Sequence, residues 1–301
     1  MHFSAAVARA LAAGRPVVAL ESSVFAQGLP EPANREARDR MVRAITRHGA
    51  VPAITAVARG RLVVGLEGAD LERFLARDGI VKVAARDLAA AATLGADGAT
   101  TVSASLVLAA RAGIRAFATG GIGGVHRDAP FDESSDLIEL SRNPVVCVCA
   151  GAKAILDLRA TSERLETLSV PVIGFGTDWL PEFYCAGATI PVAWRMDSAE
   201  QVARLFERHL ALGMTSAVLV GNPPPEGSGL APDEIGTAVA AALRELKSAG
   251  IAGREVTPAL LASVERATGG RSVATNLALL ESNADLAARI AVALAAPEKN
   301  R

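Results

Sequence analysis

The chain alternates short apolar runs with longer segments in which apolar residues recur every three or four positions. Continuous apolar runs indicate strands covered on both faces, and the recurring segments predict helices with one buried face. The predicted strands are residues 16–20, 51–58, 61–66, 80–84, 114–119, 144–150, 170–175 and 215–221. The clearest predicted helices are residues 34–48, 103–112, 198–211, 232–249 and, last in the chain, about 273–295. This alternation is typical of an α/β protein with a largely parallel or mixed sheet.

Two of the predicted helices begin with recognisable capping residues. Ser198 stands three residues before Gln201, which is the spacing of a capping box. Thr257 is predicted to cap the helix that precedes the last one, with Pro258 in its first turn.

Composition narrows the class of protein. At 301 residues, half of them hydrophobic, the chain can bury a large core, and we expect one domain over residues 1–301. The net charge of −1 and the 4% aromatic content disfavour nucleic-acid binding. We find no membrane-spanning run, and Arg9 interrupts the apolar N-terminal stretch, which makes it a poor signal peptide. The three cysteines form neither a disulfide framework nor a zinc pattern, so we expect a soluble cytoplasmic protein.

The segment TGGIGGVHR (119–127) is rich in glycine and follows a predicted strand. The dinucleotide fingerprint fails, because its third glycine would fall on His126. A P-loop also fails, since the sequence has no Gly-Lys pair. Two interpretations remain about equally supported: a turn whose backbone approaches or cradles a ligand, and a tight structural connection.

The segment FDESSDL (131–137) places Asp132 and Asp136 on either side of two serines. Carboxylate and hydroxyl oxygens suit a hard cation such as Mg²⁺ or Mn²⁺, and they also suit sugar hydroxyls. Asp and Ser equally favour helix starts, and taken alone the segment favours that interpretation by about two to one.

Two lysines stand in apolar stretches, and a glutamate ends a predicted strand. Lys82 lies within IVKVA, and Lys153 follows the run VVCVCA. An amine in an apolar site loses its proton more readily and becomes a competent nucleophile. Alternatively, such a lysine extends its charge to water or forms an ion pair. Glu21 directly follows PVVAL, a good position for a general acid or base, although a solvated strand end also explains it.

In order along nearly the whole chain, these segments resemble the pseudouridine-5′-phosphate glycosidase family, also known as the indigoidine synthase A-like family. The matching motifs are VVALESSVFAQGLPEPAN, GAVPAITAV, KVAARDL, GATTVSAS, FATGGIGGVHR, FDESSDL, VCVCAGAKAILDL, VPVIGFGTD, NPPPE and GREVTPALLASVERATGGRS. Each motif alone is weak, but their joint order is highly specific. The resemblance implies an α/β/α sandwich with a central mixed, largely parallel sheet, and a homotrimer.

The resemblance also implies an activity. Members of that family reversibly cleave the C–C bond that joins ribose 5-phosphate to uracil. They open the sugar ring and form a lysine imine at C1′, and that lysine matches Lys153. Glu21 matches the proton donor, Lys82 a substrate-contacting lysine, and Asp132 the aspartate that binds a divalent metal, usually manganese. The other residues implied to contact or line the substrate site are Val102, His126, Ser134, Ser135, Asp136 and Asn276.

The sequence departs from the family pattern at several positions. Gln27 stands where the family usually has histidine, Glu133 where it has isoleucine, and Ser282 where it has asparagine. Ala84 and Ala154 replace serines. Glutamine keeps hydrogen bonding but does not titrate near neutral pH. Glu133 adds a negative charge beside the expected metal and phosphate, which would tighten metal binding or weaken phosphate binding.

The leading hypothesis is therefore a pseudouridine-5′-phosphate glycosidase that uses Mn²⁺ or another divalent cation. One alternative is an imine-forming lyase or aldolase on another sugar phosphate, which would release no uracil. Another is a catalytically inactive ligand-binding homologue, which would form no borohydride-trappable adduct at Lys153. On the leading hypothesis the glycine run is a close-approach loop at the edge of a sugar-phosphate site.

Overall fold

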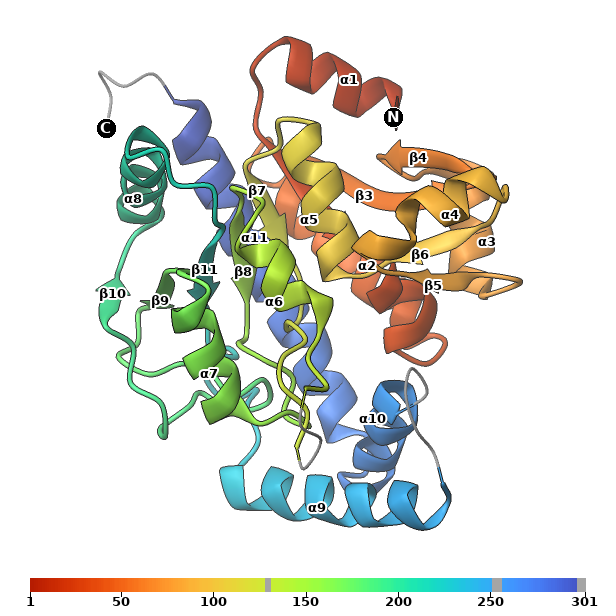
Figure 1. The fold of residues 1–301 in the computed structure, drawn as a ribbon, viewed down its shortest axis with the longest axis vertical. Helices are drawn as coiled ribbons and strands as arrows, with labels where there is room; N and C mark the ends of the chain where they lie inside the picture. Colours follow the sequence, from red (N-terminus) through yellow and green to blue (C-terminus); the bar gives the residue numbers. More distant parts are fainter. Residues whose placement is uncertain (128–130, 251–255, 297–301) are drawn as a thin grey trace.

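A mixed sheet forms the centre of the molecule in the computed structural model, which describes residues 1–127, 131–250 and 256–296 (Figure 1). The strands in the described part of the chain are β1 (His2–Phe3), β2 (Val17–Glu21), β3 (Val51–Ala58), β4 (Arg61–Val64), β5 (Val81–Val83), β6 (Gly98–Thr100), β7 (Ala116–Ala118), β8 (Val146–Cys149), β9 (Val172–Phe175), β10 (Trp194–Met196) and β11 (Val218–Gly221). Their order is β1-β4-β3-β2-β7-β8-β11-β9-β10, with β6 paired to β3 and β5 paired to β6. The pairings of β3 with β4 and with β6 are antiparallel, and the others are parallel.

Helices cover both faces of this sheet (Figure 1). The described helices are α1 (Ala5–Ala12), α2 (Ala33–Thr46), α3 (Gly68–Ala76), α4 (Leu88–Thr93), α5 (Val102–Arg111), α6 (Ser135–Leu140), α7 (Leu158–Thr167), α8 (Ala199–Ala211), α9 (Pro232–Ser248), α10 (Val256–Ala267) and α11 (Arg271–Ala295), with a π-helical turn η1 (Val24–Gly28) and a 3₁₀ turn η2 (Ala85–Asp87). The long helix α11 packs on β2, β7 and β8 together with α2 and α8, whereas α5 and α6 pack on each other and α5 also packs on β2 and β3. Because β8 lies between these layers, each of its residues is completely buried.

The structure confirms each strand predicted from the apolar runs, with ends that differ by at most three residues. It adds β1, β6 and β10, which have only two or three residues and are too short to show a pattern. Ser198 caps α8 as predicted, since its Oγ accepts from Gln201 N at 3.2 Å while Gln201 Oε1 accepts from Ser198 N at 3.1 Å. The prediction for Thr257 was wrong, because α10 already includes Val256 and Thr257 therefore lies inside the helix. Within the described residues, no helix is both long and apolar enough to cross a bilayer.

Candidate active site

The carboxyl ends of three neighbouring parallel strands meet at one edge of the sheet. Glu21 is the last residue of β2, Thr119 directly follows β7, and Lys153 lies four residues beyond the end of β8. The strand order β2-β7-β8 places these residues side by side. In open α/β sheets this edge is where ligands bind.

Glu21 is buried in a network of hydroxyl groups. Its side chain is 4% exposed, and its two carboxylate oxygens accept hydrogen bonds from Ser23 Oγ and Thr119 Oγ1. Burial raises the pKa of the Glu21 carboxyl above its ordinary value, while the charge of Lys153 and the two hydroxyl hydrogen bonds act in the opposite direction. A carboxyl that keeps its proton to higher pH is suited to donate that proton to a substrate.

The loop that carries Lys153 runs beside the glycine-rich segment, and backbone hydrogen bonds join the two. Ile122 N donates to Gly151 O at 3.0 Å, and Lys153 N donates to Ile122 O at 3.1 Å. The guanidinium of Arg127 adds bonds to two carbonyl oxygens of the lysine loop, Leu156 O at 3.1 Å and Ala154 O at 3.3 Å. The glycine segment therefore supports the position of Lys153.

The glycines are required by close packing against other parts of the protein. A Cβ at Gly121 would collide with the ring of Phe183, and a Cβ at Gly124 would collide with the side chain of Thr161. A Cβ at Gly123 would collide with Ser134, which lies in the predicted substrate-binding segment. These contacts support the interpretation of a tight structural connection, because what approaches these glycines is the chain itself. The approach of a ligand to this loop stays a prediction.

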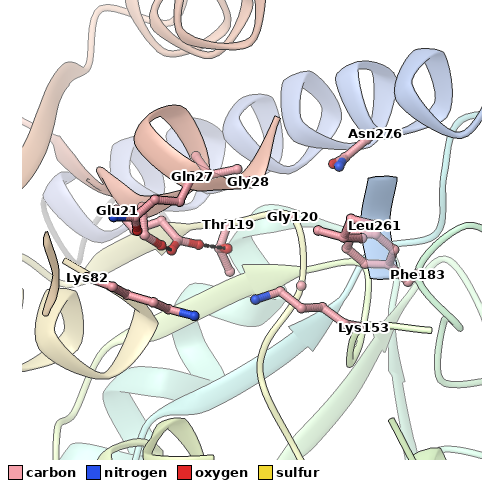
Figure 2. A pocket seen from close by; sticks show the side chains of 13 residues that line it. Glu21, Gln27, Gly28, Lys82, Thr119, Gly120, Lys153, Phe183, Leu261 and Asn276 are labelled. Atoms are coloured by element: carbon pink, nitrogen blue, oxygen red, sulfur yellow. Dashed lines mark hydrogen bonds between the residues drawn. The ribbon is translucent and has the colours of Figure 1, made fainter. Parts of the chain in front are cut away.

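Two adjoining cavities open at this edge of the sheet and share Glu21, Ser23, Lys82 and Lys153 in their linings. The smaller has a volume of about 50 Å³ and is shown in Figure 2, where the two lysine side chains point toward each other below Glu21. Its further lining residues are Val24, Gln27, Gly28, Thr119, Gly120, Gly121, Phe183, Leu261 and Asn276. The larger cavity has a volume of about 610 Å³ and extends over β5, α4 and the loop that leads into α6.

Each of the site residues predicted from the sequence lines one of these cavities. Glu21, Lys82 and Lys153 line both, and Asn276 lines the smaller one. The predicted residues that line the larger cavity are Val102, His126, Asp132, Ser134, Ser135 and Asp136. Residues from distant parts of the chain are thus brought to one site.

Part of the FDESSDL segment serves to hold the loop in place. Ser134 is the N-cap of α6, and its Oγ accepts from Asp136 N at 3.2 Å, which confirms the helix-start interpretation. The carboxylate of Asp136, 5% exposed, accepts from Ser103 N at 2.9 Å and from Gly123 N at 2.8 Å. Asp136 thereby joins α6 to the start of α5 and to the glycine segment.

The setting of Lys82 differs from the buried one that its sequence predicts. Lys82 is exposed on β5, a three-residue strand whose partner in the sheet is β6. An apolar run on a short peripheral strand does not guarantee cover on both faces. Lys153, in contrast, is half-buried.

Asp132 is the side chain that would hold the expected divalent cation. Among the described residues no group of three or more His, Cys, Asp or Glu side chains is placed to enclose a metal. Asp132 is exposed and lines the larger cavity. A single carboxylate together with a substrate phosphate is a usual way of holding Mg²⁺, and Mn²⁺ suits the same oxygen ligands.

Some site residues had no distinct signal in the sequence. Ser23 and Thr119 bond Glu21, but serine and threonine are common at strand ends. Phe183 reaches the cavity from a segment without regular secondary structure.

The extra charge of Glu133 is compensated within the protein. Its carboxylate accepts from Arg164 Nε at 2.8 Å, and Arg164 lies on α7. The side chains of the pair are 33% and 38% exposed. The expected effect of Glu133 on metal or phosphate is therefore reduced by a partner that the local sequence did not reveal.

Known proteins resemble this chain over nearly its full length. The family model described as "Indigoidine synthase A like protein" matches residues 6–293. A pseudouridine-5′-phosphate glycosidase of Gemmatimonas aurantiaca is 59% identical over 288 residues, which cover 96% of this chain and 94% of the relative. One from Myxococcus xanthus is 49% identical over 298 residues, 98% of each chain.

Solved structures agree with this assignment. The prealnumycin C-glycosynthase AlnA in complex with ribulose 5-phosphate has a TM-score of 0.91 and 40% identity, covering 100% of this chain and 98% of its own. An indigoidine synthase A-like protein from Thermotoga maritima has a TM-score of 0.88 and 37% identity, covering 94% of each chain. The expected α/β fold with a largely parallel sheet is confirmed, and the chain belongs to the indigoidine synthase A-like family.

Proposed function

We propose that this protein is a pseudouridine-5′-phosphate glycosidase, which reversibly cleaves the bond between C1′ of ribose and C5 of uracil. The observation that supports this best is the placing of an amine, Lys153, and a buried carboxyl of raised pKa, Glu21, at the junction of two cavities. Two relatives of this chain bear that name, at 59% and 49% identity. The reacting bond would lie at the junction, with the two halves of the substrate on opposite sides of it.

The two cavities suit the two halves of the substrate. The larger one carries the polar loop with Asp132, His126 and Ser135, which suits a phosphorylated, polyhydroxylated ribose. The smaller one presents the ring of Phe183 and the amides of Gln27 and Asn276, which suits a planar heterocycle with polar edges. We therefore assign ribose 5-phosphate to the larger cavity and uracil to the smaller one.

The reaction needs a nucleophile and a proton donor because C1′ carries no leaving group of the usual glycosidic kind. Lys153 Nζ bonds to C1′ as the C1′–O4′ bond opens, and the proton that the nitrogen then loses goes to O4′. The nitrogen lone pair then forms the C1′=N double bond while the C1′–C5 electron pair passes to the base. Glu21 gives its proton to C5, which releases uracil. Water hydrolyses the imine to ribose 5-phosphate and restores the amine.

A divalent cation such as Mn²⁺ forms part of the proposal. Asp132 would hold it, and its charge would offset that of the substrate phosphate. Lys82, which lines both cavities, would contact the substrate on the same side. We further propose that the protein works as a cytoplasmic homotrimer, as the family resemblance implies. Light scattering of the purified protein measures the number of subunits.

The test is uracil release from pseudouridine 5′-phosphate by the wild type and by Lys153→Ala. We expect release with Mn²⁺, a lower rate with a chelator, and none from the variant. Borohydride reduction in the presence of ribose 5-phosphate should add the sugar phosphate to Lys153, as located by peptide mass spectrometry. A folded wild type that releases no uracil but traps another sugar phosphate would favour a different imine-forming lyase. Absence of any adduct would point to a ligand-binding homologue.

A further inference from the structure

Gln27 faces the smaller cavity from η1, the π-helical turn that begins three residues after Glu21. Isolated π-helical turns are rare and are often found at functional sites. Gln27 lies beside Glu21 in the wall of the smaller cavity, which the proposed function assigns to the base (Figure 2).

The orientation of the Gln27 amide follows from its one hydrogen bond. Its Nε2 donates to the backbone oxygen of Ile80 at 3.3 Å, and a carbonyl oxygen accepts only from a donor. The amide nitrogen therefore points to Ile80, and Oε1 is the atom left for another contact.

That oxygen lacks a donor in the described part of the protein. Gln27 Oε1 is inaccessible to solvent and accepts no hydrogen bond from any described residue. The same is true of Oδ1 of Asn276, which lines the same cavity and is 6% exposed. Buried carbonyl oxygens are nearly always paired in folded proteins, because an unmade bond at such an atom is costly. A ligand N–H group that reaches either oxygen would supply its missing hydrogen bond.

We propose that Gln27 is a specificity-determining residue whose Oε1 accepts a hydrogen bond from a ring N–H of the uracil base. This inference rests on the proposed function and adds to it the atom, Gln27 Oε1, that recognises the base. A uracil joined to ribose through C5 keeps both N1–H and N3–H, whereas one joined through N1 keeps only N3–H. Acceptor oxygens in this cavity therefore favour the C-linked nucleotide over its N-linked isomer.

Because residue 27 is a glutamine, the proposed contact with the base does not depend on pH. A side-chain amide does not change protonation between pH 5 and 9, so Oε1 remains an acceptor across that range. A histidine at this position would offer either a donor or an acceptor, depending on its tautomer and on pH. Recognition of the base through Gln27 is accordingly independent of pH.

The test compares three substrates with the wild type, Gln27→Ala and Gln27→His. The substrates are pseudouridine 5′-phosphate and its N1-methyl and N3-methyl derivatives. Gln27→Ala should lower kcat/KM for the parent about tenfold to a hundredfold, because it removes the acceptor. It should also make room for a methyl group, so that preference for the parent over one of the two methylated substrates falls by at least about tenfold. Gln27→His should keep part of the preference at high pH.

The failure of this inference is distinguishable from failure of the proposed function. Borohydride trapping of ribose 5-phosphate at Lys153 involves no base and should be equal in the wild type and Gln27→Ala. If uracil is released by the wild type, and Gln27→Ala changes kcat/KM by the same factor for all three substrates, the Gln27 contact is wrong while the reaction stands. If the wild type releases no uracil, both are wrong.

Discussion

Lys153 and Lys82 point into the same cavities, yet the chain holds them in different ways (Figure 2). Lys153 follows a strand from the middle of the sheet, and its backbone is bonded to the glycine segment. Lys82 is exposed on the short strand β5, which joins the sheet through β6. The residues proposed to break the bond are placed by the buried centre of the sheet, and the lysine proposed to contact the substrate is placed by its periphery. A covalent step needs its atoms positioned more accurately than a charge contact does.

Removal of each lysine in turn is the strongest test of this comparison. Lys153→Ala should lower kcat by on the order of 10⁴-fold or more, because the nucleophile is lost. Lys82→Ala should mainly raise KM, by about tenfold to a hundredfold, because it removes a charged contact. Steady-state rates of uracil release with borohydride trapping measure both. Normal trapping in Lys82→Ala is expected, and loss of trapping there would mean that the two lysines act as one unit.

Substitution of Glu21, the proposed proton donor, should have the next largest effect on the rate. Glu21→Gln should lower kcat by about 10²–10⁴-fold, since the amide keeps the shape and hydrogen bonding of the side chain but has no proton to give. The imine with ribose 5-phosphate should still form, because its formation does not need C5 to be protonated. A near-normal rate of uracil release in this variant would assign the proton donor to another residue.

The same variant separates catalysis from stability. The pKa of Glu21 is higher in the folded state than in the unfolded chain, chiefly because of burial, so the folded protein binds the proton more tightly. Stability of the wild type therefore falls as pH rises from the unfolded to the folded pKa, and the cost persists above it. Relative to the wild type, Glu21→Gln should gain a few degrees in Tm at neutral pH and nothing at pH below about 4. A Tm difference that does not change with pH would contradict this.

A substitution in the closely packed glycine segment should have an intermediate effect on stability and activity. A Cβ at Gly123 would lie 2.9 Å from Asp136 Oδ2 and closer still to Ser134 Oγ, so Gly123→Ala should destabilise the protein by about 1–3 kcal/mol and lower activity. Gly236 in α9 is a matched control, because a Cβ there meets no atom within 4 Å. Gly236→Ala should stabilise the helix by about 0.5–1 kcal/mol and leave activity unchanged. Urea unfolding and uracil release measure the pair; equal effects of the two substitutions would refute the packing argument.

The smallest effect on stability and rate is expected from the ion pair of Glu133 and Arg164 at the protein surface. Glu133 and Arg164 form an exposed ion pair, which typically contributes less than about 1 kcal/mol. Glu133→Ile and Arg164→Ala should each change stability by no more than that, and kcat should stay close to the wild-type value. The Mn²⁺ concentration that gives half-maximal rate is the sensitive readout. A large shift in that concentration for Arg164→Ala would show that the pair controls the metal loop.

Much of the fold was predictable because its strands carry a strong local signal. β8 is buried on both faces and apolar throughout, and β3 is buried from Ala53 onward with Thr55 as its one polar residue. β6 has three residues, Gly98–Thr100, and a run of that length has no readable period. Lys82 shows the limit of predicting burial from sequence, since the apolar residues around it do not indicate whether their strand lies at the centre or the edge of the sheet.

The sequence by itself determined the α/β class and the order of the motifs, because these depend on residue types and their spacing. Its resemblance to a known family also singled out Glu21 and Lys153 as the proposed reacting groups. Only the tertiary structure decided how the site is held together. The hydrogen bond from Thr119 to Glu21 and the packing of Gly124 against Thr161 join residues far apart in the chain. That Gln27 Oε1 lacks a hydrogen-bond donor among the described residues can be seen only when the partner of Nε2, the backbone oxygen of Ile80, is known. Such contacts depend on how the strands are ordered in space, and no local pattern of residues carries that information.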